Sequence, residues 1–173
     1  MATTEIGMLS KLKEDFEARE CKVIALCVDT KDNIRKWIED IQELQECVVW
    51  FPIIADHNAE ISRILNLVKP NFVNAKRNLR PATSTFTVDI DRRIRHLAQY
   101  PSSTGRNFYE TLRAVDTMQL SLFHQVVAPA NWKQGEEVYV HPGLNSTAAT
   151  PLFPKGFNEV RSWLRSTTQP DSE

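Results

Sequence analysis

The feature that most constrains the fold is a continuous apolar run at residues 22–28, which an amphipathic helix follows directly. A run without polar alternation is typical of a parallel strand that is buried on both faces. Asp29 and Thr30 are capping residues for the helix. Its apolar stripe is Ile34, Trp37, Ile38, Ile41 and Leu44. A strand followed by a helix is half of a βαβ unit, so the chain is predicted to be α/β.

The same alternation extends to both sides of this unit. The first segment predicts an amphipathic helix, with Thr3 and Thr4 as N-cap candidates and a stripe of Ile6, Leu9, Leu12 and Phe16. Residues 51–55 predict a short strand, after which Asp56 or Asn58 caps a helix through Ile61, Ile64 and Leu65. The polar residues 69–81 predict a long surface loop.

A strand, a tight polar turn and a helix are predicted around residues 100–108. Residues 84–90 and 94–100 indicate an antiparallel hairpin that turns at Asp91 and Arg92, and Pro101 ends its second strand. The following helix carries the stripe Phe108, Leu112, Val115, Met118 and Leu122. Arg106 therefore lies beside a helix N-terminus, where anions bind in open α/β sheets. It either serves an anionic centre or is a surface or capping arginine with an ion-pair partner.

The last third of the chain differs in composition from the rest. Residues 126–155 hold four prolines and one strand-like run at 138–140, which indicates an appended segment. A short apolar stripe of Val160, Trp163 and Leu164 follows, and then a polar terminus that is expected to fray.

Composition and charge exclude several classes of function. A formal net charge of -1 gives no global field for nucleic acid or an anionic membrane. No apolar run reaches membrane-spanning length and no leader is evident, so a cytoplasmic protein is expected. The four histidines show no metal-ligand spacing, and neither a metal nor a cofactor is predicted. Arg92, Arg93 and Arg95 are interpreted as a solvated strand edge.

Three cysteines cannot all pair, so they are interpreted as reduced thiols. Cys21 and Cys27 flank or lie in the predicted buried strand, where a cysteine is usually an inert small hydrophobe. Cys47 lies in a predicted loop without a helix N-terminus or a nearby arginine, and incidental oxidation is expected there rather than turnover.

Several segments resemble the peroxiredoxins of the one-cysteine, peroxiredoxin-six type. Residues 1–7 (MATTEIG) are similar to the family's PVCTTELG motif, and residues 51–56 and 100–108 match the family strongly. Residues 129–133, 152–156 and 163–165 resemble the C-terminal domain of this type. The likeness covers nearly the whole chain.

The resemblance implies a thioredoxin-like α/β fold, N-terminally incomplete, with a small C-terminal extension domain. It implies a peroxiredoxin core at residues 1–123 and a dimerisation domain at 124–173, and hence a homodimer. The family reduces hydrogen peroxide and alkyl hydroperoxides with a cysteine thiolate, and an external thiol recycles the resulting sulfenic acid. Family members also carry a segment ahead of this first helix, including a central strand whose absence would leave its neighbours unpaired.

The resemblance fails at the decisive position, because Ala2 occupies the place of the reacting cysteine. Thr83 stands where the family has an arginine in the first hairpin strand, whereas Arg106, Glu5 and Thr3 match family positions. Asp91 matches the aspartate of a lipase-like triad that cannot be completed here, and is interpreted as a turn residue. Two hypotheses follow: a peroxiredoxin that is truncated or inactive as written, or a catalytically inactive partner that dimerises with active peroxiredoxins through the C-terminal segment and the hairpin edge.

Overall fold

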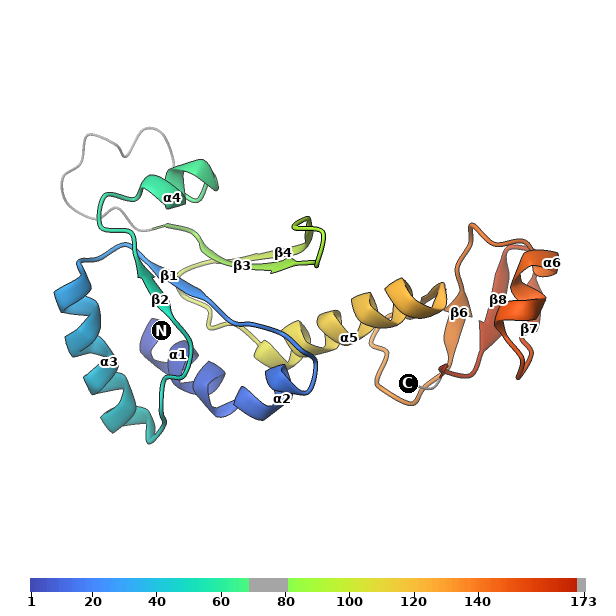
Figure 1. Cartoon of the computed structure of the whole chain (residues 1–173), viewed down its shortest axis with the longest axis horizontal. Helices are drawn as coiled ribbons and strands as arrows, with labels where there is room; N and C mark the ends of the chain where they lie inside the picture. The colour runs from blue at the N-terminus through green and yellow to red at the C-terminus, as the bar shows by residue number, and fades with distance from the viewer. Residues whose placement is uncertain (69–80, 171–173) are drawn as a thin grey trace. The chain divides into compact units, whose positions relative to one another are not determined.

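The computed structural model describes residues 1–68 and 81–170, which form two compact units, Met1–Phe108 and Tyr109–Glu173 (Figure 1). Nearly all of the predicted loop at 69–81 lies outside the described residues. The first unit is α/β, as predicted. The domains predicted from sequence, residues 1–123 and 124–173, remain a prediction.

The chain begins with two consecutive helices, α1 (Ala2–Lys11) and α2 (Lys13–Glu17). The predicted apolar stripe is confirmed, since Ile6, Leu9, Leu12 and Phe16 are all buried. The predicted cap is wrong. Met1 is the N-cap, no side chain caps the helix, and the Thr4 hydroxyl donates to the Met1 carbonyl at 2.7 Å.

Helix α3 (Lys31–Gln45) packs beside α1. Thr30 is its N-cap, as predicted, and its hydroxyl accepts a hydrogen bond from the Asn33 amide at 3.3 Å. Ile34 and Ile41 are buried, but Leu44 at the end of the predicted stripe is 68% exposed.

Two indoles fix α1 near both of its ends. The Trp37 Nε1 of α3 donates to the Thr3 hydroxyl at 3.1 Å, and the Trp50 Nε1 donates to the Ser10 carbonyl at 3.1 Å. Between these contacts, Gly7 gives room to Gln45, because a Cβ at Gly7 would lie 2.5 Å from the Gln45 Cγ. The close approach of the two helices thus depends on the missing side chain.

Strand β1 (Ala25–Cys27) pairs in parallel with β2 (Ile53–Ala55) in a two-stranded sheet. The predicted strand is present, but burial on both faces is not. Residues 25–27 are half-buried and Ile24 is 64% exposed. The reason is that, within the described ranges, β2 is the single strand that pairs with β1.

After β2, the chain forms the short helix α4 (Glu60–Ile64). Asp56, one of the two predicted caps, accepts hydrogen bonds from amides in the first turn of α4. The residue at the N-cap position is nevertheless Ala59. The Asp56 carboxylate accepts from the Ile61 amide at 3.1 Å and from the Ser62 amide at 2.9 Å. The predicted apolar stripe of α4 is not buried, because Ile61, Ile64 and Leu65 are 37%, 79% and 37% exposed.

The predicted hairpin is confirmed as β3 (Thr83–Val88) and β4 (Ile94–Tyr100), which pair antiparallel. Asp89 organises the turn, which includes Asp91 and Arg92 as expected. The Asp89 carboxylate accepts from the Arg93 amide at 2.8 Å and from the Arg95 Nε at 2.5 Å.

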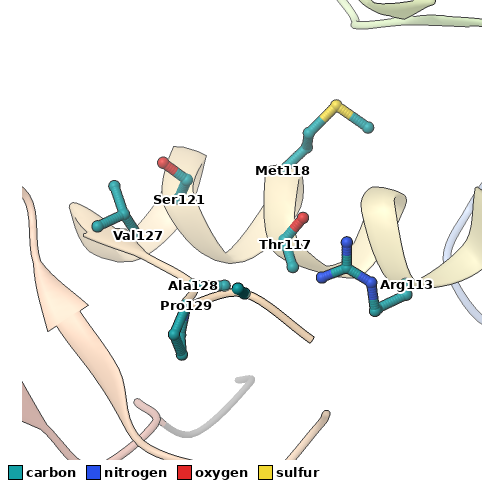
Figure 2. Close-up of a pocket in the computed structure, with 8 residues that line it drawn as sticks. Arg113, Thr117, Met118, Ser121, Val127, Ala128 and Pro129 are labelled. Carbon is teal, nitrogen blue, oxygen red and sulfur yellow. The ribbon is translucent and has the colours of Figure 1, made fainter. Parts of the chain in front are cut away.

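Helix α5 (Phe108–His124) begins in the first unit and belongs mainly to the second. Phe108, Leu112 and Val115 of its predicted stripe are buried, whereas Leu122 is 52% exposed and Leu120 is buried instead. One face of α5 and residues 127–130 line an open cavity of about 420 Å³ (Figure 2).

The second unit is built on an antiparallel four-stranded sheet with the order β5-β6-β8-β7. Its strands are β5 (Val126–Val127), β6 (Val138–Val140), β7 (Asn158–Arg161) and β8 (Leu164–Thr167). Helix α6 (Ser146–Ala149) and the 3-10 helix η2 (Thr150–Leu152) lie between β6 and β7. The strand at 138–140 was predicted, but the hairpin of β7 and β8 was not.

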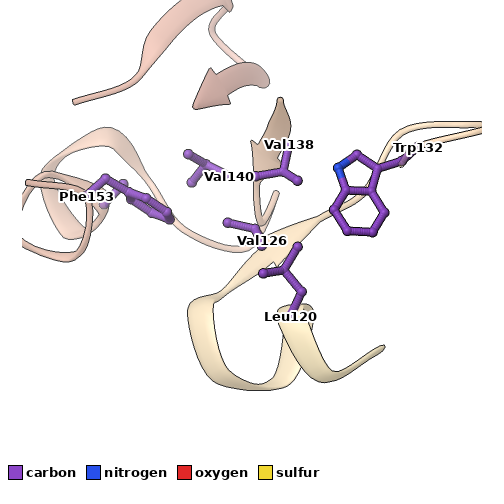
Figure 3. Packing of buried hydrophobic residues seen from close by; sticks show 7 residues of the cluster. Leu120, Val126, Trp132, Val138, Val140 and Phe153 are labelled. Atoms are coloured by element: carbon purple, nitrogen blue, oxygen red, sulfur yellow. The ribbon is translucent and has the colours of Figure 1, made fainter. Parts of the chain in front are cut away.

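A separate apolar core lies within this second unit (Figure 3). Its buried members are Leu120, Val126, Trp132, Val138, Val140, Ala149 and Phe153. Trp132 is only 2% exposed, and its Nε1 donates to the Glu136 carbonyl at 3.1 Å. Trp163, in contrast, is 70% exposed, because it lies in the turn between β7 and β8 rather than on a helix.

Candidate functional site

The turn between β4 and α5 has the predicted form. Strand β4 ends at Tyr100, the Thr104 amide donates to the Pro101 carbonyl at 2.9 Å, and α5 begins at Phe108. Arg106 therefore projects from a short, closed turn just before a helix. Its backbone amide donates to the Glu5 carboxylate at 2.9 Å, so the turn is joined to α1.

Arg106 and Glu5 form a two-point ion pair. The Arg106 Nε lies 3.1 Å from Glu5 Oε1, and its Nη2 lies 2.9 Å from Oε2. The Glu5 side chain is 6% exposed and that of Arg106 is 19% exposed. Such a fork-to-fork contact fixes orientation as well as charge.

Strand β3 and the first residue of α5 supply the remaining contacts of Arg106. Its Nη1 donates to the Ser84 carbonyl at 3.2 Å and to the Thr85 hydroxyl at 3.3 Å, and its guanidinium lies 5.3 Å from the Phe108 ring centre. Among the described residues, these contacts use four of its five N–H groups. Sequence reasoning missed both acceptors, because the Ser84 carbonyl carries no sequence signal and only the fold brings the Thr85 hydroxyl to Arg106.

The environment keeps Glu5 ionised. Burial opposes the charged carboxylate, but hydrogen bonds from the Arg106 side chain and amide, with the attraction of its charge, outweigh that effect. The pKa of Glu5 is consequently lowered from its ordinary value. The site therefore contains a fixed negative charge and a fixed positive charge in contact.

Ala2 and Thr3 occupy the first turn of α1, ahead of Glu5. Ala2 is the first helical residue and is exposed, and it offers only a methyl group. The Thr3 hydroxyl accepts from Trp37, and no contact with Arg106 is among its described interactions. The structure thus brings Glu5 and Arg106 together, while Thr3 is directed toward α3.

Thr83 lies on the strand that Arg106 contacts. It is the first residue of β3 and pairs with Tyr100. Because side chains two residues apart share a face of a strand, Thr83 is on the same face as Thr85, which binds Arg106. A residue at position 83 is therefore well placed to act beside Arg106, but a threonine brings no charge.

None of the three cysteines forms a disulfide, and all are half-buried. Burial and, secondarily, the Asp29 charge raise the pKa of the Cys27 thiol. Its thiolate is therefore less available than that of an ordinary cysteine. Cys47 follows α3 in a loop, as predicted, and its amide donates to the Gln42 carbonyl at 3.3 Å.

The described residues form neither a metal site nor a membrane-spanning helix. No group of three or more His, Cys, Asp or Glu side chains in residues 1–68 and 81–170 is arranged to hold a metal ion. No helix in the same ranges is long and apolar enough to cross a bilayer.

The cavity beside α5 is lined by Arg113, Thr117, Met118 and Ser121 of the helix (Figure 2). The guanidinium of Arg113 forms an ion pair with Glu110, because its Nε and Nη2 each lie 2.7 Å from a Glu110 carboxylate oxygen. This pairing raises the pKa of Arg113.

Comparison with known proteins gives a consistent result. The model of the AhpC/TSA family matches residues 1–97. A 1-Cys peroxiredoxin of Dictyostelium discoideum is 39% identical over 171 residues, which are 99% of this chain and 69% of the relative.

Two solved structures support the same relationship. A cysteine-to-serine mutant of the peroxiredoxin 6 of Arenicola marina is 33% identical with a TM-score of 0.88, over 99% of this chain and 80% of its own. The yeast mitochondrial 1-Cys peroxiredoxin, whose thiol resolution was studied with the glutathione and thioredoxin systems, is 34% identical with a TM-score of 0.88. That match covers 96% of this chain and 79% of the yeast protein.

Proposed function

The chain belongs to the AhpC/TSA family and its relatives are 1-Cys peroxiredoxins, and from this we propose that it is a peroxiredoxin without peroxidase turnover of its own. The thioredoxin-like fold comes with the family. The relatives' activity is the reduction of hydroperoxides, and the question is which parts of that chemistry this chain retains.

The observation that carries the proposal is Ala2 in the first turn of α1, beside an intact Glu5–Arg106 pair. In the family reaction a thiolate attacks one peroxide oxygen, the O–O bond breaks, and the departing alkoxide or hydroxide takes a proton. The sulfur becomes a sulfenic acid, which an external thiol reduces. A methyl group supplies no electron pair for the first step.

The other thiols do not replace the missing nucleophile. A peroxidatic thiol must be ionised at neutral pH, and the pKa of Cys27 is raised. Cys21 and Cys47 follow the ends of α2 and α3 rather than preceding a helix, so no helix N-terminus stabilises a thiolate there.

The test measures peroxide consumption with an external thiol as reductant. The wild-type chain and a variant lacking Cys21, Cys27 and Cys47 should show the same background rate. Catalytic turnover by the wild type that is lost in the thiol-free variant would overturn the proposal.

A gain-of-function series asks whether the rest of the site is competent. Ala2→Cys, Thr83→Arg and the double variant should be compared in the thiol-free background. Ala2→Cys alone is expected to react weakly, because the Arg106 guanidinium is engaged with Glu5. The double variant should react faster, since position 83 shares a face with Thr85.

We also propose a role for the inactive chain as a dimerising partner of active peroxiredoxins through its C-terminal segment and the edge of the β3–β4 hairpin. The apolar core around Trp132 supports this proposal, because the second unit has a packed core of its own, which does not depend on a reactive residue at position 2. Sedimentation and co-purification with an active relative should show a dimer or a mixed dimer, and a strictly monomeric protein would contradict it.

The predicted cytoplasmic location remains a prediction, as one relative is mitochondrial.

A further inference from the structure

A thioether sulfur lies beside the Glu5–Arg106 pair. Met1 is the N-cap of α1 and directly precedes Ala2. A Cβ placed on Gly105 would lie 2.9 Å from the Met1 Cε, so the methyl end of this side chain lies against the turn that carries Arg106. Because Cε is bonded to the sulfur, the thioether is at the same turn. Met1 is also 62% exposed, so a dissolved reagent can reach it.

Arg106 supplies a hydrogen-bond donor at this turn. It follows Gly105 directly in the chain. Four of its five N–H groups are engaged by Glu5, Ser84 and Thr85, and the fifth, on Nη2, has no acceptor among the described residues. A donor of this kind stabilises an oxygen that develops negative charge as it leaves. The turn therefore offers both a sulfur lone pair and a partner for the departing charge.

We propose that the Met1 thioether is the peroxide-reactive sulfur of this site and that hydroperoxides convert it to the sulfoxide. A sulfur lone pair attacks the terminal oxygen of the hydroperoxide, and an S–O bond forms as the O–O bond breaks. The proton of that oxygen passes to the departing alkoxide, or to hydroxide when the substrate is hydrogen peroxide. The sulfur loses the two electrons that the peroxide gains, so the products are one sulfoxide and one alcohol or water.

Such a reaction is stoichiometric and rests on the proposed function, in which the site has no thiol of its own. Each chain consumes one hydroperoxide at Met1 and then carries a polar oxygen beside Gly105. A methionine sulfoxide reductase is the class of enzyme that would restore the thioether.

The other two methionines serve as internal references for the experiment. Met8 on α1 and Met118 on α5 are half-buried. Hydrogen peroxide or cumene hydroperoxide is added to the variant lacking all three cysteines, and peptide mass spectrometry follows the gain of oxygen at each methionine. Met1 should react on the order of tenfold faster than Met8 or Met118. It should also react faster than the methionine of a free peptide of residues 1–11, which is exposed but lacks Arg106.

Gly105→Ala tests whether the turn matters. The added Cβ would displace the Met1 methyl group, so the Met1 rate should fall to that of the free peptide. Gly143→Ala is the matched control, because its Cβ would lie 3.1 Å from the His141 Nδ1 in the second unit, and it should leave the Met1 rate unchanged. Matching thermal unfolding of both variants would show that the fold is retained.

Three outcomes would overturn the inference: a Met1 rate equal to that of the free peptide, a Met1 rate that Gly105→Ala does not change, or a purified chain from which Met1 is absent. Turnover through a cysteine would instead contradict the proposed function. It would leave the Met1 rates unaffected, because these are measured in the variant without thiols.

Discussion

Glu5 is a carboxylate at 6% exposure whose charge is matched by one arginine, and this makes it the most consequential single residue of the site. The same pair connects α1, the turn before α5 and β3, because Arg106 reaches all three. Ionic contacts of this kind cost desolvation energy, so losing one partner leaves the other charge buried without compensation. The pair is thus a fold determinant whether or not chemistry occurs beside it.

Glu5→Gln is expected to lower the free energy of unfolding at neutral pH by about 2 kcal/mol, because Arg106 loses its counter-charge but keeps a polar neighbour. The folded pKa of Glu5 lies below its ordinary 4.5, so its stabilisation is present above that value and is lost as the pH falls through the folded pKa. Urea unfolding at neutral pH and near pH 3 should show the difference between the wild type and the variant shrinking in acid. An equal difference at both values would contradict this account.

Much of this site was predictable at the residue scale, but unevenly. The ion-pair interpretation of Arg106 held, and its partner was the glutamate that the resemblance had singled out. The carbonyl of Ser84 was not predictable, because every residue has one and only the fold selects which is used. Thr3, which the resemblance also assigned to the site, accepts a hydrogen bond from the Trp37 indole, a contact between residues 34 positions apart in the chain.

Among the elements, α1 and α3 pack against each other. The stripe of α1 and the cap of α3 followed from spacing and residue type, which are local properties. The half-exposed state of β1 did not, because burial depends on which strands lie next to it. The apolar run at 22–28 shows that the strand could be buried on both faces, but it does not show which elements cover those faces.

Gly7→Ala tests the contact between these two helices. Alanine favours a helix by about 1 kcal/mol over glycine, but here its Cβ would lie 2.6 Å from the Gln45 Cβ. We expect the clash to prevail and the free energy of unfolding to fall by about 1–3 kcal/mol. Gly7→Ala combined with Gln45→Gly should lose less relative to Gln45→Gly alone, because the Cβ and Cγ of residue 45 are then both absent, and chemical denaturation of the set measures it. A Gly7→Ala variant more stable than the wild type would contradict this expectation.

The molecule as a whole consists of two units with separate cores, and the family resemblance predicted an extension where the second unit lies. The strand pair β7–β8 was not visible in the sequence. Val160, Trp163 and Leu164 have the spacing of a helical turn, but a tight turn and cross-strand pairing determine their structure. Tertiary context thus overrode local spacing there.

Trp132→Ala tests whether the two cores are independent. Truncating a fully packed indole costs about 3–5 kcal/mol, and we expect that loss in the second unit. Hydrogen exchange should accelerate at the amides of β6 and β8, while the protected amides of α3 keep their rates. Equal acceleration in both units would mean that the chain unfolds as one cooperative body.

The two indoles that bind α1 have a practical consequence. Trp37 and Trp50 reach the helix near opposite ends, so a detachment of α1 would change the surroundings of both chromophores at once. Fraying of its first turn alone would disturb only Trp37. The difference in emission between the protein and variants in which Trp37 or Trp50 alone is replaced by phenylalanine would therefore report the release of the first helix, because Trp132 and Trp163 contribute equally to each.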